Sequence, residues 1–297
     1  MTGSGPPGRD PFSRYRDLMA AVGFRPSTTR GQNFLLDPSL HRWIAEQAGP
    51  SSSDTVIEIG VGLGFLTREL AARAGKVLAV EIEPRLLEIA KSEVPDSGNL
   101  EWLEGDALGG AGRTLTSRIG EVAKECTGRL LVVANLPYSV SGPMLAELAQ
   151  LVRLPDRIVV LVQKELGQRL SGNCGSSTYG GLSGLLQSMF TTRSLRDVSP
   201  SVFRPRPKVW SSVVALDLRA DISKELQLAT RRRRFALFLR TLFGQRRKAL
   251  RSTYRLAADA MGRPGAALDE SWACKRAQEL TPDELVGLWV GCETNSG

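Results

Sequence analysis

The sequence predicts an α/β fold in which a mostly parallel, doubly wound, Rossmann-like sheet is followed by a small C-terminal helical domain. Short apolar runs of strand length alternate with stretches that have the spacing of amphipathic helices. A glycine-rich turn follows the first of these runs, as it does where such sheets bind ligands. Beyond Leu218 the alternation stops and only helical patterns remain. The 42% apolar content of the 297 residues is enough for a substantial core.

The elements of the sheet follow in order from Pro38, where Leu40 and Ile44 give helical spacing up to Ala48. Five strands are expected, over Asp54–Ile59, Val77–Val80, Leu100–Leu103, Leu130–Ala134 and Ile158–Val162. The first strand leads through a glycine turn to a helix that ends at about Ala74. Pro84 opens the helix after the second strand, because proline is favoured at the first helical position.

The last part of the chain is expected to be helical over Arg231–Phe243, Gln245–Ala257 and Pro282–Trp289, with Gly262–Gly265 as a breaker. A domain boundary is placed around Leu218–Ile222. Three parts result: an N-terminal tail with a leading helix (1–29), a sheet domain (30–220) and a helical domain (221–297).

Basic residues are concentrated in one part of the chain. The whole chain carries a net charge of +8, whereas residues 204–255 alone contain 15 basic and 3 acidic residues. This pattern favours a polyanion such as RNA as the partner, although a solvated helical surface would give the same pattern.

Several function classes are disfavoured by composition. The four cysteines have no C-x-x-C pairing, which fits reduced thiols in a cytoplasmic protein better than zinc or disulfides. His41 is the single histidine, expected on a helix surface, so histidine-based catalysis and a multi-histidine metal site are both disfavoured. No apolar run is long enough to span a bilayer, and the first ten residues do not resemble a secretion signal.

The strand ends in the first half predict a site for an adenosine-containing ligand. The glycine turn Gly60-Val-Gly62-Leu-Gly64 lacks the G-x-G-x-x-G spacing of dinucleotide sites, which favours a cofactor without a pyrophosphate. Glu81, after the second strand, is placed to accept two hydrogen bonds from ribose hydroxyls, and Asp106 could accept one from an adenine amino group. S-adenosylmethionine fits this set. Each feature alone also has an explanation that involves no ligand, because glycines occur in ordinary turns and carboxylates at strand ends often cap helices.

The four residues Asn135-Leu-Pro-Tyr138 follow the strand Leu130–Ala134 and predict the place of the second substrate. The Asn135 amide oxygen and the carbonyl of Leu136 or Pro137 can accept hydrogen bonds from an exocyclic amine. The ring of Tyr138 can stack on the base that carries this amine. Such a mouth suits methyl transfer to adenine N6, a reaction that needs no metal because a sulfonium methyl is already activated.

With these segments in family order, the chain resembles the ribosomal RNA small-subunit adenine N6,N6-dimethyltransferases of the KsgA/RsmA type. The matching segments are Gly31–Leu35, Glu58–Gly62, Glu81, Gly105–Ala107, Asn135–Tyr138, Gln163–Glu165, Tyr179-Gly180, Phe203–Val209 and Gln245–Lys248. Three departures stand out: Glu83 and Trp210 replace the usual aspartates, and the connection Leu108–Arg129 is long.

The resemblance implies a class I S-adenosylmethionine-dependent methyltransferase that dimethylates two adjacent adenosines in a loop near the 3′ end of 16S rRNA. It implies cofactor contacts from Asn33, Leu35, Gly60, Glu81, Asp106 and Asn135. The residues expected at the target adenine are Asn135, Pro137, Tyr138 and Phe203, with Tyr138 and Phe203 on its flanks. RNA contacts are expected from Lys208, Arg246, Arg247 and Lys248. The expected partner is small-subunit rRNA or a pre-assembled small subunit, bound by a monomer.

Other interpretations stay open. A resistance-type methyltransferase acting on 23S rRNA shares most of these motifs, and a non-catalytic nucleic-acid-binding factor can use the same scaffold. Tyr138 could instead cap the core, and Phe203 could merely pack its loop. A nicotinamide dehydrogenase is disfavoured by the early Gly64 and the basic C-terminal part.

Overall fold

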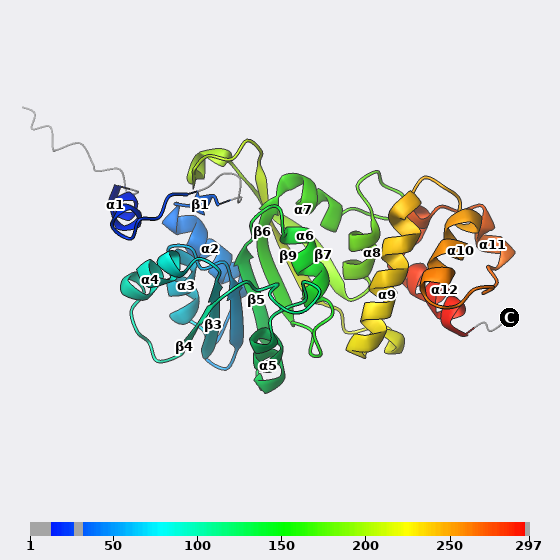
Figure 1. Cartoon of the computed structure of the whole chain (residues 1–297), viewed down its shortest axis with the longest axis horizontal. Helices are drawn as coiled ribbons and strands as arrows, with labels where there is room; N and C mark the ends of the chain where they lie inside the picture. The colour runs from blue at the N-terminus through cyan, green and yellow to red at the C-terminus, as the bar shows by residue number, and fades with distance from the viewer. Residues whose placement is uncertain (1–12, 27–31, 295–297) are drawn as a thin grey trace, which may run out of the picture.

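The computed structural model describes residues 13–26 and 32–294, which contain a seven-stranded sheet of order β4-β3-β2-β5-β6-β9-β7 and a two-stranded sheet of β1 and β8 (Figure 1). The strands are β1 (Phe34–Leu35), β2 (Thr55–Ile59), β3 (Lys76–Glu81), β4 (Leu100–Glu104), β5 (Leu130–Asn135), β6 (Arg157–Gln163), β7 (Phe190–Val198), β8 (Phe203–Arg204) and β9 (Ser211–Leu218). The pairs among β2 to β6 are parallel, and β9 runs antiparallel to β6 and β7. The predicted tail over residues 1–12, together with Arg30 and Gly31, lies outside the described residues.

The five predicted strands are confirmed, each to within one residue at either end. These strands can be recognised in the sequence because parallel strands are covered on both faces and are therefore continuous runs of apolar residues. Two antiparallel strands, β7 and β9, carry no such prediction. In β7 most residues between its ends are polar and at least partly exposed, because this strand lies at the edge of the sheet.

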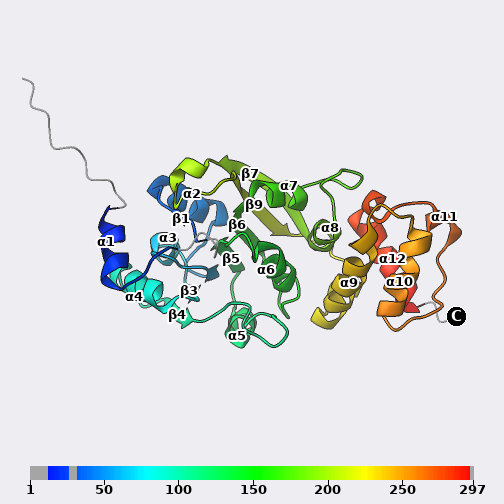
Figure 2. The ribbon, with the colours of Figure 1, turned by 45° about the horizontal axis from the view of Figure 1, so that its top comes forward.

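Helices cover both faces of the sheet, as expected for a doubly wound Rossmann-like fold. The helices up to the end of the sheet are α1 (Ser13–Ala21), α2 (Pro38–Ala48), α3 (Phe65–Ala71), α4 (Pro84–Glu93), α5 (Ser117–Glu125), α6 (Ser141–Leu148), α7 (Lys164–Leu170) and α8 (Gly181–Gln187). Buried residues of α2 and α3 share one core with one face of the sheet, and those of α5, α6 and α7 share another with the opposite face. Seen from a second direction, α1 lies beside α4, at the end of the molecule opposite the C-terminal helices (Figure 2).

Local signals explain the bounds of α2, which match the prediction. Asp37 caps the helix through Oδ1, which accepts hydrogen bonds from the backbone N–H groups of Ser39 (2.9 Å) and Leu40 (3.3 Å). The helix stops at Gly49, which has a left-handed φ of 60°. The expectation that His41 lies on the surface of this helix is wrong. The His41 ring is buried, with Nε2 3.0 Å from the Leu35 carbonyl, and burial lowers its pKa to about 4.

The chain after β9 is helical, as predicted. It contains α9 (Ala229–Leu242), α10 (Leu250–Ala260), α11 (Glu270–Ala273) and α12 (Pro282–Thr294). Short 3-10 helices span Pro200–Val202, Lys224–Leu226, Phe243–Gln245 and Ala277–Glu279. One prediction here is wrong: Gln245–Lys248 does not belong to a long helix but ends a 3-10 helix and forms the turn before α10. The helices α9 and α12 both contact α8, so their core is continuous with that of the sheet. The division at Leu218–Ile222 stays a prediction.

Part of the basic stretch makes contacts inside the molecule. Arg232 is buried, and its guanidinium donates hydrogen bonds to backbone carbonyls that include those of Ala149 (3.0 Å) and Leu226 (2.7 Å). Arg231 and Arg234 both pair with Glu293. Three of the four arginines at 231–234 thus make contacts within the protein, although Arg234, like Arg233, is exposed. The sequence pattern therefore overstated the charge available to a polyanion.

Among the described residues, none of the helices combines the length and apolar character needed to cross a membrane.

Candidate active site

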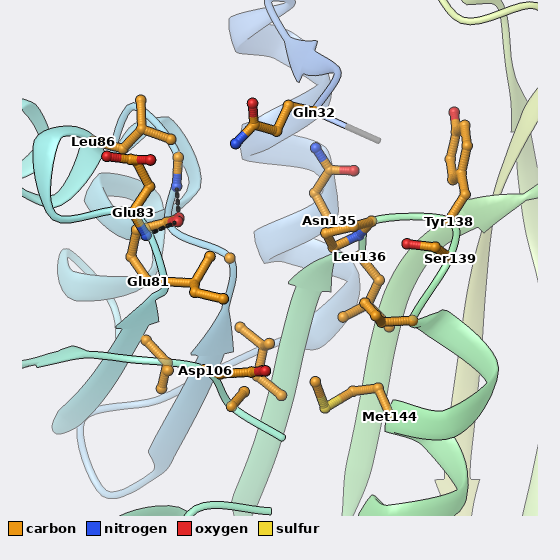
Figure 3. A pocket seen from close by; sticks show the side chains of 18 of the residues that line it. Gln32, Glu81, Glu83, Leu86, Asp106, Asn135, Leu136, Tyr138, Ser139 and Met144 are labelled. Atoms are coloured by element: carbon orange, nitrogen blue, oxygen red, sulfur yellow. Dashed lines mark hydrogen bonds between the residues drawn. The ribbon is translucent and has the colours of Figure 1, made fainter. Parts of the chain in front are cut away.

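A cavity of about 560 Å³ lies at the carboxyl edge of the parallel strands, which is where open α/β sheets bind ligands (Figure 3). It runs from the glycine turn after β2, past the ends of β3 and β4, to the segment after β5. Its lining includes these residues that the sequence singled out: Asn33, Gly60, Gly62, Glu81, Glu83, Asp106, Asn135, Leu136, Pro137, Tyr138 and Phe203. The fold thus brings the predicted cofactor side and the predicted target side into one space.

Glu81 organises the cofactor side of the cavity. Its Oε2 accepts a hydrogen bond from the backbone N–H of Gly62 (2.8 Å), and its Oε1 accepts one from the N–H of Glu83 (3.0 Å). Burial raises the pKa of Glu81, while the N–H donors oppose this shift. A carboxylate oxygen has two lone pairs, so each oxygen can still accept a hydroxyl hydrogen from the cavity. Two adjacent ribose hydroxyls match this geometry.

The three glycines of the turn have different roles. Gly60 and Gly62 have left-handed φ values of 84° and 58° and line the cavity. Gly64 does not line it. A Cβ at Gly64 would lie 2.7 Å from Cγ2 of Val94 and 3.2 Å from Cβ of Ala90, so this glycine lets α3 pack closely on α4. Gly64 also has a left-handed φ of 80°, so its backbone conformation and the close packing of α3 on α4 together account for the early third glycine.

Glu58 is a buried acidic residue that lies in one of the matching segments but had no predicted role. It lies on β2 with no exposed surface, and neither carboxyl oxygen has a hydrogen-bond partner among the described residues. Burial raises its pKa to about 8, so Glu58 is mostly neutral at pH 7. A neutral Glu58 places no second negative charge beside the Glu81 carboxylate that lines the cavity.

The remaining predicted cofactor residues differ in position. Asp106 points into the cavity in Figure 3, and its Oδ1 accepts a hydrogen bond from the N–H of Leu108 (2.8 Å). Asn33 lines the cavity as well. Leu35 does not: its side chain is buried in the core between α2 and the sheet, while Phe34, one residue earlier, faces the cavity. The predicted contact of Leu35 with the cofactor stays a prediction.

The target side is formed by the segment after β5. In Figure 3 the Asn135 amide and the Tyr138 ring point in the same direction, beyond the end of β5. The carbonyl of Pro137 already accepts hydrogen bonds from the N–H of Val140 (3.1 Å) and the hydroxyl of Ser141 (2.9 Å). Both of its lone pairs are therefore used, which leaves Leu136 as the better carbonyl acceptor for an incoming amine.

Tyr138 is half-buried at the rim of the cavity and is fixed at its far end. Its hydroxyl lies 2.8 Å from the Ser211 hydroxyl on β9, and burial raises its pKa. Phe203 lines the cavity but is only 1% exposed, because its strand pairs with β1 and its ring packs in the core. Because the Tyr138 ring is anchored at its hydroxyl, it presents a fixed apolar face, as stacking requires.

The predicted RNA contacts lie in two places. Lys208 is exposed on the loop before β9, and this loop follows β8, whose Phe203 lines the cavity. Arg246, Arg247 and Lys248 are exposed on the turn between α9 and α10, where Nη1 of Arg246 donates a hydrogen bond to the Ser177 carbonyl (3.0 Å). The described residues contain no group of three or more His, Cys, Asp or Glu side chains arranged to hold a metal ion.

We predict that Glu81→Ala weakens binding of S-adenosylmethionine by about 1–3 kcal/mol, because it removes an acceptor of charge-assisted hydrogen bonds and loosens the turn at Gly62. Isothermal titration calorimetry measures this. Glu104→Ala is the matched control, since Glu104 is the register partner of Glu81 on β4, is exposed and does not line the cavity. An unchanged dissociation constant for Glu81→Ala would refute the role.

Comparison with known proteins agrees with this site. The family model described as ribosomal RNA adenine dimethylase matches residues 23–261. The proteins called ribosomal RNA small subunit methyltransferase A of Rhodospirillum rubrum and Magnetococcus marinus are 37% and 35% identical over 260 and 248 residues. These matches cover 87% and 82% of this chain and 85% and 84% of those proteins.

Solved structures agree with the fold. A dimethyladenosine transferase from Plasmodium falciparum superposes with a TM-score of 0.68 at 24% identity, covering 86% of this chain and 96% of that one. The 23S rRNA methyltransferase ErmE gives a TM-score of 0.59 at 22% identity, covering 88% and 100%.

Proposed function

The chain belongs to the ribosomal RNA adenine dimethylase family, and we propose that it dimethylates N6 of two adjacent adenosines in a loop near the 3′ end of 16S rRNA, with S-adenosylmethionine as methyl donor. The observation that carries the proposal is the single cavity that joins the buried Glu81 carboxylate to the mouth formed by Asn135 and Tyr138. The names of the relatives support the small subunit as the source of the RNA.

The residues of the cavity fit the methyl donor. Glu81 offers carboxylate oxygens to two ribose hydroxyls, and Asp106 offers an acceptor to an adenine amine. Gly60 and Gly62 line the cavity without side chains, so a ligand can lie against their backbone. Bound S-adenosylmethionine supplies an activated methyl group on a sulfonium sulfur.

The last residue of β5, Asn135, and the residues that follow it prepare the nucleophile. The lone pair of the adenine N6 amine is delocalised into the ring, which makes the amine a poor nucleophile. Hydrogen bonds from N6–H to the Asn135 amide oxygen and the Leu136 carbonyl favour a more tetrahedral nitrogen with a localised lone pair. Holding the amine in one orientation lowers the entropic part of the activation free energy, by up to roughly 7–11 kcal/mol in ideal cases.

The base reaches this position out of its stack. Tyr138 offers a fixed ring face on which the extruded adenine stacks, a contact worth about 1–3 kcal/mol per base. Each transfer breaks the bond between the sulfonium sulfur and the methyl carbon, leaves a neutral thioether, and ends when the methylated N6 releases one proton to solvent. The monomethylated amine keeps one hydrogen, which one of the two acceptors can bind to orient it for the second transfer. We further propose that the enzyme acts as a monomer in the cytoplasm, on small subunits during their biogenesis.

Mass spectrometry of rRNA fragments tests the proposal. Purified enzyme and S-adenosylmethionine are incubated with unmethylated small subunits and, separately, with large subunits. The expected product is a 16S fragment in which two neighbouring adenosines each carry two additional methyl groups. Methylation of 23S rRNA alone would support the resistance-type alternative, and no methylation with retained RNA binding would support a non-catalytic factor.

The exposed turn between α9 and α10 is proposed as a second RNA-binding surface. Replacing Arg246 and Arg247 by glutamate is expected to weaken RNA binding. The log of the association constant should also fall less steeply with log salt, with a slope smaller in magnitude by about 0.7–0.9 for each phosphate that the variant no longer neutralises. Filter binding over a salt series measures this. The control is the double reversal of Lys91 and Lys124, which are exposed on α4 and α5 and change the net charge equally. Equal slopes for both variants would contradict RNA binding at this turn.

A further inference from the structure

Trp210 is an exposed aromatic residue at the carboxyl edge of the sheet, outside the cavity lining, and the proposed chemistry does not use it. Half of it (51%) is exposed, and it immediately precedes β9. Single exposed apolar residues are common on protein surfaces and need no explanation by themselves. The surroundings of this residue are what distinguish it.

The sheet places the backbone of Trp210 one residue from the serine that contacts Tyr138. Ser211, the first residue of β9, pairs with Gln163 at the end of β6, so β9 begins at the carboxyl edge where the cavity opens. The Ser211 hydroxyl lies 2.8 Å from the Tyr138 hydroxyl. The backbone of Trp210 therefore lies next to the residue that anchors the Tyr138 ring. Because side chains alternate along an extended strand, the indole lies beside Lys164, on the other side of this edge from the Ser211 hydroxyl.

Lys164 fixes the position of Trp210. The N–H of Lys164 donates a hydrogen bond to the Trp210 carbonyl (2.9 Å), and its Nζ lies 6.0 Å from the centre of the indole ring. The same Nζ forms an ion pair with Asp197 at 2.6 Å. Since the ammonium is held by Asp197, the indole has a charged neighbour on one side while half of its surface remains open to solvent.

The loop that leads to Trp210 is basic. Arg204, Arg206 and Lys208 are all exposed and alternate with proline and apolar residues up to Val209. An exposed indole with the Lys164 ammonium beside it, at the end of a basic loop, matches the two parts of an unpaired nucleotide, a base and a phosphate. It does not match an apolar protein segment, which would leave these cations without partners.

We propose that Trp210 is a stacking platform for the unpaired nucleotide adjacent to the adenine that enters the cavity. Two bases of one strand would then be held by two aromatic residues linked through Ser211, one at the target and one beside it. The inference rests on the proposed function and deepens it, because it says how the neighbouring nucleotide of the RNA loop is recognised.

The test uses the whole chain and an RNA hairpin with two adjacent adenosines in its loop. Trp210→Ala is expected to raise the KM for the hairpin by about tenfold, with kcat at saturating RNA and the dissociation constant for S-adenosylmethionine both within about twofold of wild type. Trp210→Phe, which keeps a stacking face, is expected to restore most of the affinity. Val152→Ala is the control: Val152 is also exposed but precedes β6, at the opposite edge of the sheet.

Hairpins that carry 2-aminopurine on either side of the adenosine pair give a direct readout. Binding of wild type should quench one of these probes, and Trp210→Ala should abolish that quenching. The inference is overturned if Trp210→Ala matches Val152→Ala in KM, or if its defect falls on kcat instead, which would mean that Trp210 only supports Ser211 and Tyr138. A wild-type chain that transfers no methyl group to any rRNA would overturn the proposed function as well.

Discussion

Replacing Asn135 by alanine is expected to lower kcat by about 100-fold or more while the affinity for RNA stays within about twofold. In the proposed complex the amide oxygen accepts a hydrogen bond from the N6 amine, so its removal abolishes orientation of the nucleophile and a hydrogen bond that strengthens as positive charge develops on nitrogen. Removing one such preorganised group typically costs about 10²–10³ in rate. Single-turnover kinetics with saturating hairpin RNA separate this effect from binding.

Asn135→Asp provides the comparison for this prediction. It keeps an acceptor oxygen at the same place and should retain more activity than Asn135→Ala. A variant Asn135→Ala whose defect lies in KM for RNA, with kcat preserved, would show that Asn135 only helps to bind the loop.

Tyr138→Ala is expected to reduce kcat/KM by about 50-fold or more, whereas Tyr138→Phe should lose only about fivefold. Alanine removes the whole stacking face, worth about 1–3 kcal/mol, together with the side-chain atoms that shape the rim. Phenylalanine keeps the face and loses one hydrogen bond to Ser211, worth about 0.5–1.5 kcal/mol. Steady-state kinetics on the hairpin RNA measure both variants.

The hydrogen bond at Tyr138 supplies its own control. Ser211→Ala removes the same bond from the other side and should match Tyr138→Phe in kcat/KM. Equal losses in Tyr138→Phe and Tyr138→Ala would argue against stacking and would place the function in the hydroxyl.

The fold was predictable where burial produces a simple pattern. The strand β5 is buried over Leu130–Ala134 and reads as an unbroken apolar run, so its bounds followed from the sequence. The edge strand β7 is mixed in composition because one side of it faces solvent, and β1 and β8 have two residues each. The pairing of β1 with β8 joins segments about 170 residues apart, and local patterns do not report such pairs.

The site was predictable as a set of strand ends, but the contacts within it were not. The sequence placed Glu81 and Asn135 at one edge because parallel strands end there together. It could not show that Gly64 serves packing, or that both lone pairs of the Pro137 carbonyl are used by the turn. Leu35 lay in a matching motif, yet the alternation of side chains along a strand turns it toward the core.

The charge pattern was less informative than the apolar pattern. Arg232 lies within the basic stretch that favoured a polyanion partner, yet it is a buried donor to carbonyls of a distant segment. A run of arginines reports only that charge is present. Whether it faces solvent depends on tertiary contacts such as the pairs to Glu293.

A crystal structure of the chain with S-adenosylhomocysteine and the hairpin RNA tests the central claim most directly, which is that donor and target meet in the cavity at the carboxyl edge of the sheet. We expect the ribose hydroxyls within hydrogen-bonding distance of Glu81, and an extruded adenine against Tyr138 with N6 at Asn135. An RNA loop that leaves the cavity empty of any base, with the Tyr138 ring turned away from it, would contradict the account.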